Sequence, residues 1–184
     1  MKSLIAVAAL AAAAAIAAPA SAQSIADLKP VSYYGSAGYT GIDYLGNNLG
    51  AVTLRVGANA GKYLGAEVEG AFGVADAGLS YPGIGSAKIH LNNEYAGYVV
   101  GRYPVLPNLD LLARVGYGHQ EIKASVTGLG SATDGVDSLN YGVGGQYQFD
   151  AKNGLRLEWT RYDFRASNAK PADAWTLSYV YKFQ

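Results

Sequence analysis

Two glutamates, two positions apart, are the residues of this sequence that come nearest to a catalytic pair. In an extended chain Glu67 and Glu69 lie on one face, as paired carboxylates do in general acid–base chemistry. The period of a strand produces such pairs without any catalytic role, and buried carboxylates are usually paired with a cation. We therefore expect both glutamates to form ion pairs, with Arg55 on the preceding strand as the partner.

The histidines are the other residues with possible chemistry. His119 has Glu121 and Ser125 close to it in sequence, which supplies the residue types of a hydrolase with serine, histidine and an acid. A single histidine among polar residues is more often only solvated. The second histidine, His90, has no further ligands at a spacing that suits zinc or copper, and the chain has no cysteine. We predict no catalytic residue, no metal site and no cofactor.

The elements that must position these residues are strands, because the apolar residues recur with a period of two. In the stretch LNYGVGGQYQFD, residues 139–150, every second residue from Leu139 to Phe149 is apolar or glycine, whereas the intervening positions are polar or glycine. The same pattern predicts eight strands, at residues 32–42, 51–59, 64–74, 88–103, 109–122, 137–149, 155–164 and 173–183. Little helix is expected elsewhere.

The connections between these strands alternate strictly between short and long. Tight turns are predicted at residues 60–63, 104–108 and 150–153, and the longest loops at residues 75–87 and 123–136. All tight turns therefore lie at one end of an up-and-down antiparallel meander. Eight such strands can close into a barrel that has no free edge. The predicted fold class is an all-β, eight-stranded antiparallel up-and-down barrel that spans a membrane.

The faces of the strands decide between a soluble and a membrane barrel. The less apolar face consists of small residues and a few charged ones, which suits the narrow interior of an eight-stranded barrel rather than a solvated surface. We predict that these charged residues form a charge network in the lumen: Arg55, Glu67, Glu69, Glu94, Arg102, Arg114, Arg156 and Glu158. The apolar face has aromatic residues toward the strand ends, as in the two aromatic belts of membrane barrels, and is therefore expected to face lipid: Tyr33, Tyr63, Tyr103, Tyr147, Trp159, Trp175 and Tyr181.

The first residues predict export from the cytoplasm. Lys2 precedes an apolar, alanine-rich run at residues 4–18, and Ala20-Ser21-Ala22 provides a small-x-small cleavage site. The sequence therefore predicts a signal peptide at residues 1–22 and a single barrel domain at residues 23–184. The 14 basic and 14 acidic residues of the chain give no basic patch for a nucleic acid, so no nucleic-acid partner is expected.

Four runs of the sequence resemble the outer-membrane β-barrel family that includes OmpA-type transmembrane domains, OmpX-like proteins and opacity porins: YLGAEVEGAFG at 63–73, VGRYPVLPNLDLLARVGYG at 100–118, LRLEWTRYDF at 155–164 and WTLSYVYKF at 175–183. The resemblance implies a location in the outer membrane of a Gram-negative bacterium, in contact with membrane lipid and lipopolysaccharide. It also implies that the barrel-assembly machinery recognises the last strand through Tyr179, Tyr181 and Phe183, although Gln184 follows where such proteins commonly end on the aromatic residue.

Three functions are compatible with this reading. The first is a structural or surface-interaction role, in which the barrel spans the membrane and displays its loops to an unidentified surface ligand. The second is a narrow porin-like channel for ions or small solutes, which a polar lumen would permit. The third is a lipid-modifying enzyme at the rim, built around His119.

Overall fold

The computed structural model describes residues 30–44, 47–75, 77–81, 85–126, 130–166 and 169–183. The predicted signal peptide at residues 1–22 and the C-terminal Gln184 lie outside this part of the chain. The described residues form nine strands: β1 (Val31–Tyr44), β2 (Asn47–Ala60), β3 (Leu64–Ala75), β4 (Ala77–Tyr81), β5 (Gly85–Leu106), β6 (Leu109–Val126), β7 (Gly130–Gln148), β8 (Asn153–Phe164) and β9 (Ala172–Phe183). Within these ranges no helix is long and apolar enough to cross a membrane.

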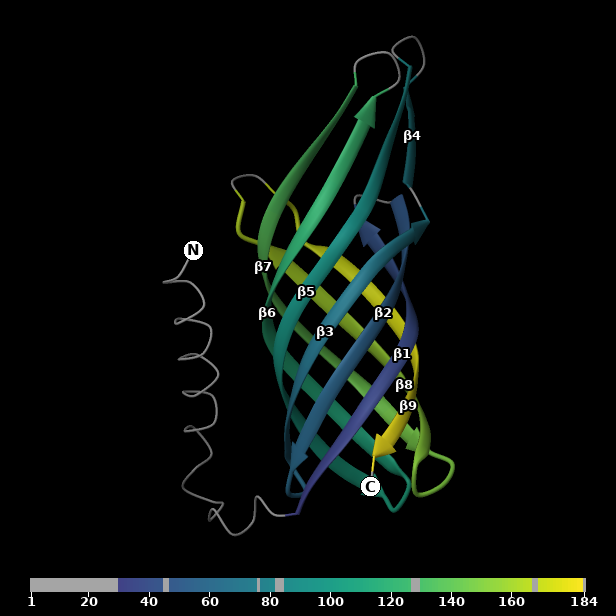
Figure 1. Cartoon of the computed structure of the whole chain (residues 1–184), viewed down its shortest axis with the longest axis vertical. Coiled ribbons are helices and arrows are strands. Elements are labelled where there is room, and N and C mark those ends of the chain that lie inside the picture. The colour runs from purple at the N-terminus through teal and green to yellow at the C-terminus, as the bar shows by residue number, and fades with distance from the viewer. Residues whose placement is uncertain are drawn as a thin grey trace.

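The strands form one antiparallel sheet that closes on itself (Figure 1). Their order is β3-β2-β1-β9-β8-β7-β6-β5-β4, and an additional pairing of β3 with β5 closes the circle. β3 and β4 pair with successive parts of β5 and are therefore two segments of one wall strand. The predicted fold class, an eight-stranded antiparallel up-and-down barrel, is confirmed.

The outer face of the wall is apolar and the inner face is polar, whereas a soluble protein has its apolar face inside. Val56 and Val68 point outward and are 64% and 69% exposed, while the intervening Arg55, Glu67 and Glu69 point inward and are at most 3% exposed. The same alternation continues along β8, where exposed leucines alternate with buried charged residues. An apolar outer surface with a charged interior requires an apolar solvent around the barrel.

The outer surface has exposed aromatic side chains near both ends of the wall. Near the tight turns they are Tyr33, Tyr63, Tyr103, Tyr147, Phe149, Tyr181 and Phe183, and further toward the loops they include Tyr39, Phe72, Tyr95 and Trp175. Aliphatic residues occupy the outward positions between these two groups, as Leu54 and Leu157 do. This arrangement has the form of the two interfacial belts of a membrane barrel.

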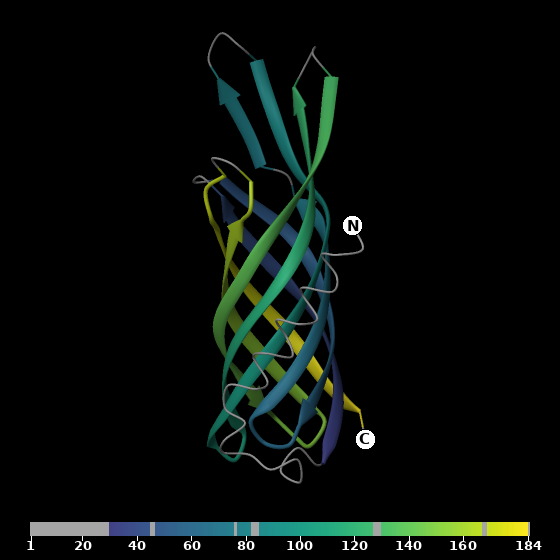
Figure 2. The same ribbon diagram turned by 90° about the vertical axis from the view of Figure 1, so that its left-hand side faces the viewer.

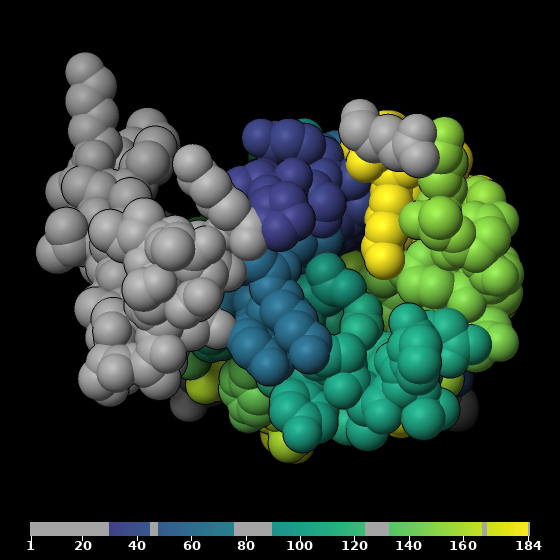
Figure 3. All heavy atoms as spheres, turned by 90° about the horizontal axis from the view of Figure 1, so that it is seen from below, coloured from purple at the N-terminus to yellow at the C-terminus, as the bar shows by residue number. Residues whose placement is uncertain are grey.

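The tight turns have local reasons for their geometry. Gly61, after β2, has a φ of 65°, a left-handed conformation that costs glycine little. In the turn between β7 and β8, Asp150 accepts hydrogen bonds of 2.8 Å from the backbone N–H groups of Lys152 and Asn153. The side chain of Asn153 also donates to this carboxylate, and together these bonds hold the pKa of Asp150 below its ordinary value. Figure 3, which looks at the lower end of Figure 1, shows the yellow end of β9 near the purple start of β1.

The expectation that residues 75–87 and 123–136 form long loops was wrong for most of their length. β4 pairs with the start of β5, and β6 pairs with β7 up to Val126 and Gly130, so both segments are hairpins. Backbone pairing continues here although the sequence lacks regular apolar alternation, because small and hydroxyl-bearing residues still permit a ladder. Figures 1 and 2 show these hairpins projecting beyond the rim.

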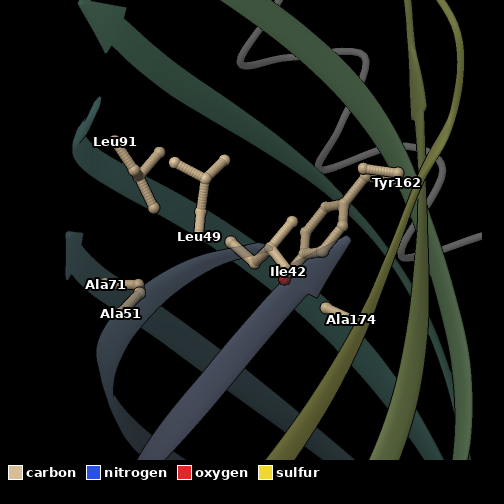
Figure 4. Close-up of a cluster of buried hydrophobic side chains, with 8 residues drawn as sticks. Ile42, Leu49, Ala51, Ala71, Leu91, Tyr162 and Ala174 are labelled. Carbon is tan, nitrogen blue, oxygen red and sulfur yellow. The ribbon is translucent and has the colours of Figure 1, made fainter. Parts of the chain in front are cut away.

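Two register shifts change which residues point inward near the loop end. One lies in β5, where Asn92 is the extra residue between Leu91 and Asn93, and the other lies in β3, where Val74 is the extra residue because Gly50 pairs with Ala75 and Ala51 with Gly73. An inserted residue moves the alternation by one position. Leu91 therefore points inward, as Glu94 does three residues later. With Ile42, Leu49, Ala51, Ala71, Tyr162, Ala172 and Ala174 it forms a buried apolar cluster, most of which is labelled in Figure 4.

Candidate functional site: a charged layer in the lumen

Six buried charged side chains from four strands meet inside the barrel. We call Arg55, Glu67, Glu69, Arg114, Arg156 and Glu158 the charged layer. Arg55 lies directly across from Glu69 in the pairing of β2 with β3, and its guanidinium forms ion pairs with Glu69 and Glu158. β2 and β8 are not neighbours in the wall, so the pair between Arg55 and Glu158 crosses the lumen.

Arg114, on β6, is the second cation of the charged layer. Its Nη1 lies 2.9 Å from Glu69 Oε2 and 3.8 Å from Glu67 Oε2, and its Nε lies 3.9 Å from Glu158 Oε1. Nη2 donates a 2.7 Å hydrogen bond to Thr160 Oγ1. One guanidinium therefore connects carboxylates of β3 and β8.

Arg156, on β8, completes the layer and binds the glutamate that was expected to pair with Arg55. Its guanidinium forms an ion pair with Glu67. Nε and Nη2 donate hydrogen bonds of 2.9 and 2.6 Å to the Gln146 side-chain oxygen, and Gln146 lies directly across on β7. The sequence had suggested Arg55 for both Glu67 and Glu69, but only the pair with Glu69 is present among the described residues.

Two tyrosines, one on β5 and one on β1, make the same kind of contacts with the charged layer. The Tyr98 ring stacks against Arg114, with 4.2 Å from the guanidinium carbon to the ring centre, and its hydroxyl donates a 3.0 Å hydrogen bond to Glu69. The Tyr34 ring lies 5.1 Å from the guanidinium carbon of Arg156, and its hydroxyl donates to Glu67. Each tyrosine thus holds one arginine and one glutamate.

Each of these tyrosines lies over a glycine of the neighbouring strand. Tyr34 is paired with Gly57 and Tyr98 with Gly116 in the register. A Cβ on Gly57 would lie 2.4 Å from Tyr34 Cζ, and a Cβ on Gly116 would lie 2.5 Å from Tyr98 Cδ1. The two glycines leave the space that lets the rings lie flat against the wall and contact the arginines.

The two remaining residues of the predicted network lie outside the charged layer. Arg102 forms an ion pair with Asp110 nearer the tight turns, where both side chains are more exposed. Glu94 is 1% exposed, lies on the loop side of the layer, and is directly across from Gln120. Its Oε1 has no hydrogen-bond partner within the described part of the chain. The structure therefore brings six of the eight predicted residues together.

The interior is layered along the barrel axis. Above the charged layer, Thr40 is hydrogen-bonded to Thr53 and Thr176, at oxygen–oxygen distances of 2.6 and 2.8 Å. The apolar cluster of Figure 4 follows toward the loops. In the charged layer each carboxylate is bound by at least one guanidinium, so this geometry suits a fixed obstruction better than a group that must exchange protons with a substrate.

The sequence profile of one protein family, described as "Outer membrane protein beta-barrel domain", matches residues 6–183. The chain belongs to this family. Among curated proteins, none matches the sequence. Because the chain belongs to this family, the protein lies in the outer membrane of a Gram-negative bacterium. In this class of barrel the tight turns face the periplasm and the longer connections face the outside.

Solved outer-membrane barrels share the fold at low sequence identity. The N-terminal β-barrel domain of OprF from Pseudomonas aeruginosa has a TM-score of 0.60 and 12% identity, and the match covers 83% of this chain and 97% of that one. OprG from the same species has a TM-score of 0.57 and 10% identity, with 88% and 100% covered. Ail of Yersinia pestis, in complex with the heparin analogue sucrose octasulfate, has a TM-score of 0.54 and 16% identity, with 83% and 97% covered.

Several residues that shape the lumen of this outer membrane protein β-barrel were not identified from sequence. Tyr34 and Tyr98 had a signal in the period of two, because they occupy the same face as Ser36 and Glu94. Because neither residue is charged, the predicted charge network did not include them. Gln146 and Thr160 had the same parity signal but no charge to draw attention to them, and only the register shows that Gln146 lies across from Arg156.

Proposed function

We propose that this outer-membrane barrel has a structural and surface-interaction role and does not conduct ions through a steady pore. It anchors in the membrane and displays the projecting hairpins of β4–β5 and β6–β7 at the cell surface. Membrane lipid, and lipopolysaccharide at the outer rim, surround its apolar wall. The barrel provides a rigid support for the hairpins, and an unidentified surface ligand binds there.

The charged layer is the observation that carries this proposal. An eight-stranded barrel has an interior just wide enough for side chains. Here Arg55, Arg114 and Arg156 extend into that interior and bind carboxylates from other strands. The three guanidinium groups neutralise the charge of the three carboxylates. Moving one of these side chains aside to admit an ion would break a buried ion pair, which is unfavourable.

The projecting hairpins support the surface-interaction part of the proposal. β4 pairs only with β5 among the described strands, and β7 pairs with β8 only from Ser138 onward. The outer edge of β4 and the first residues of β7 therefore have backbone groups that no neighbouring strand covers. Uncovered strand edges can pair with an extended segment of another protein.

The enzyme alternative has one supporting contact and one obstacle. His119 Nδ1 lies 2.7 Å from Asp137 Oδ1 in a half-exposed pair on the outer face, which would orient the ring as an acid does in a hydrolase. Ser125, the expected nucleophile, lies six residues along the same strand, a separation of roughly 20 Å at 3.3 Å per residue. Because β6 continues to Val126, the chain does not fold back to bring the two together.

Single-channel recording of the purified protein in planar lipid bilayers tests the proposal directly. We expect wild-type protein to show at most small, brief conductance steps, because the charged layer obstructs the lumen. The folded state is verified in the same sample by the change in gel mobility on heating. A large, steady, ohmic conductance from folded protein would show that the lumen is open and that the channel function is the correct one.

Two further parts of the chain are proposed to direct its biogenesis. Residues 1–22 act as the export signal, with cleavage before Gln23. In β9, Tyr179, Tyr181 and Phe183 form the signal for the barrel-assembly machinery. All three side chains point outward, and the rings of Tyr181 and Phe183 are 5.6 Å apart. An outward aromatic row at the periplasmic end of the last strand is accessible to a partner before the barrel closes.

The assembly proposal predicts that Phe183→Ala strongly lowers the amount of protein in the outer membrane. The matched control is Tyr103→Ala, because Tyr103 is an outward aromatic near the same end, with 63% exposure against 50% for Phe183. The measurement is a blot of separated membrane fractions. Equal loss in both variants would indicate a contribution of aromatic residues to membrane anchoring rather than a signal in β9.

A further inference from the structure

A cavity opens at the outer end of the lumen, beside the apolar cluster of Figure 4. Its volume is about 260 Å³. Ile42, Leu49, Leu91, Ile122 and Phe164 form most of its apolar wall. These side chains come from β1, β2, β5, β6 and β8, so the cavity is bounded by strands from around the barrel rather than by one hairpin.

The size and the lining of this cavity define the kind of molecule that fits. A cavity of roughly 150 Å³ lined by aliphatic and aromatic side chains stays dry and holds benzene, so the larger cavity here has room for a molecule of about ten non-hydrogen atoms. A wall of isoleucine, leucine and phenylalanine favours a ring system or a short, branched hydrocarbon over a sugar or an ion.

Gln120 supplies a polar group for such a molecule. Its side chain lines the cavity and is 4% exposed, and its Nε2 has no hydrogen bond of normal geometry within the described part of the chain. The Glu94 carboxyl directly across on β5 is therefore the acceptor with which a ligand oxygen would compete. A buried amide N–H without an acceptor is unfavourable, and an oxygen of a bound molecule would satisfy it. The polar lining therefore calls for a hydrogen-bond acceptor on the ligand.

The lining of the cavity disfavours an anion. Asp134 lines the cavity on the outer side, and Glu94 lies directly across from Gln120 on the inner side. A carboxylate or sulfate in this apolar cavity would lose its hydration without gaining a cationic partner, because none of the lining residues that the structure describes is basic. The acceptor on the ligand must therefore be a neutral oxygen, as in a hydroxyl or carbonyl group.

We propose that the outer end of the lumen is a binding site for a small, neutral, largely apolar molecule that carries one hydroxyl or carbonyl oxygen. The hydrocarbon part packs among Ile42, Leu91 and Phe164, and the oxygen accepts a hydrogen bond from Gln120 Nε2. This inference goes beyond the proposed surface role and does not depend on it, because the site lies on the outer side of the charged layer.

The test uses 1-naphthol, a neutral molecule of the expected size, and protein with labelled isoleucine and leucine methyl groups in phospholipid nanodiscs. We expect the methyl signals of Ile42 and Ile122 to shift saturably during a titration observed by NMR. Leu157 and Leu177 face the lipid and should shift only in proportion to the naphthol dissolved in the bilayer. A purely proportional shift at Ile42 and Ile122 as well would overturn the proposal.

Two related probes test the polar part of the site. Naphthalene lacks the oxygen and should bind about fivefold more weakly than 1-naphthol, a difference typical of one neutral hydrogen bond. Ionised 1-naphthoate should give no saturable shift. In the Gln120→Leu variant the difference between naphthol and naphthalene should disappear. Equal binding of naphthoate and naphthol, or an unchanged difference in the variant, would contradict the assigned role of Gln120.

A variant that fills the cavity tests its location. Ile122→Trp should abolish the saturable shift of Ile42, whereas Leu157→Trp, on the lipid face, should leave it unchanged. Both variants are first verified as folded by the heat-dependent change in gel mobility. Binding that persists in folded Ile122→Trp would place the molecule elsewhere; if this variant does not fold, the result with Gln120→Leu decides.

Discussion

Replacing Arg55 with alanine is expected to lower the free energy of unfolding by about 3–5 kcal/mol, the range for removal of one partner from a buried ion pair. Arg55 and its two partners, Glu69 and Glu158, are each at most 3% exposed. Without the guanidinium, Glu69 and Glu158 lose their cationic partner in a confined interior, where bulk water cannot solvate the two carboxylates instead. The measurement is reversible urea unfolding in lipid vesicles, with the folded fraction read from tryptophan fluorescence.

Second substitutions in the Arg55→Ala background test which carboxylate loses most. Glu69 keeps a 2.9 Å ion pair with Arg114, whereas Glu158 keeps only contacts of 3.9 Å with Arg114 and Arg156. We therefore expect Glu158→Gln to restore more stability than Glu69→Gln. Glu67→Gln should restore none, because Glu67 is bound by Arg156. If all three substitutions restored the same unfolding free energy, the net charge of the layer would determine stability rather than these specific ion pairs.

The matched control is an arginine on the outer face. Arg161 Nε lies 3.4 Å from Asp173 Oδ1, and the two side chains are 39% and 41% exposed. Such a pair contributes about 0–1 kcal/mol. Arg161→Ala should therefore change the unfolding free energy far less than Arg55→Ala. A similar loss of unfolding free energy in both variants would show that burial does not strengthen the ion pairs of the lumen.

Gly116→Ala is expected to destabilise the barrel by about 1–3 kcal/mol, the usual range for overpacking a tight interior. A Cβ at this position would lie 2.1 Å from the carbonyl oxygen of Gly97 and 2.5 Å from Tyr98 Cδ1. The carbonyl belongs to the ladder and cannot move away, and a displaced Tyr98 ring would lose its stacking on Arg114. Urea unfolding measures the effect.

Gly97→Ala is the control for Gly116→Ala, because a Cβ on Gly97 would have no atom within 4 Å. The two glycines lie on paired strands and close to each other in the register. We expect Gly97→Ala to be neutral or slightly stabilising, since alanine has less conformational freedom than glycine in the unfolded chain. If both substitutions changed the unfolding free energy equally, the strand propensities of alanine and glycine would explain the change, and not a steric clash of the new Cβ at position 116.

The period of two was sufficient to predict the barrel wall and, away from the register shifts near the loop end, the side of the strands that faces the lumen. Arg55, Glu67 and Arg156 could be assigned to the interior because their neighbours in sequence are aliphatic. Their partners could not be assigned, since pairing across the lumen depends on the stagger of the closed sheet. Glu158 reaches Arg55 from a strand that is not its neighbour, which local sequence does not encode.

The outer third of the lumen was missed for a different reason. The shift between Leu91 and Asn93 breaks the alternation within β5, so a strict period of two cannot place both Leu91 and Glu94 in the interior. The hairpins beyond the rim lack an apolar stripe, and without that stripe a strand cannot be distinguished from a loop by periodicity. The site around Gln120 depends on both features.

The charged layer also affects how the unfinished chain crosses the inner membrane. A transmembrane helix needs about 20 mostly apolar residues, and an arginine at its centre costs about 2.5–3.5 kcal/mol during insertion. β2, β6 and β8 each contain an arginine of the charged layer, and β3 contains two of its glutamates. These segments are consequently too polar to be retained as helices by the export channel. The charged side chains of the lumen thereby disfavour insertion of the nascent protein into the inner membrane.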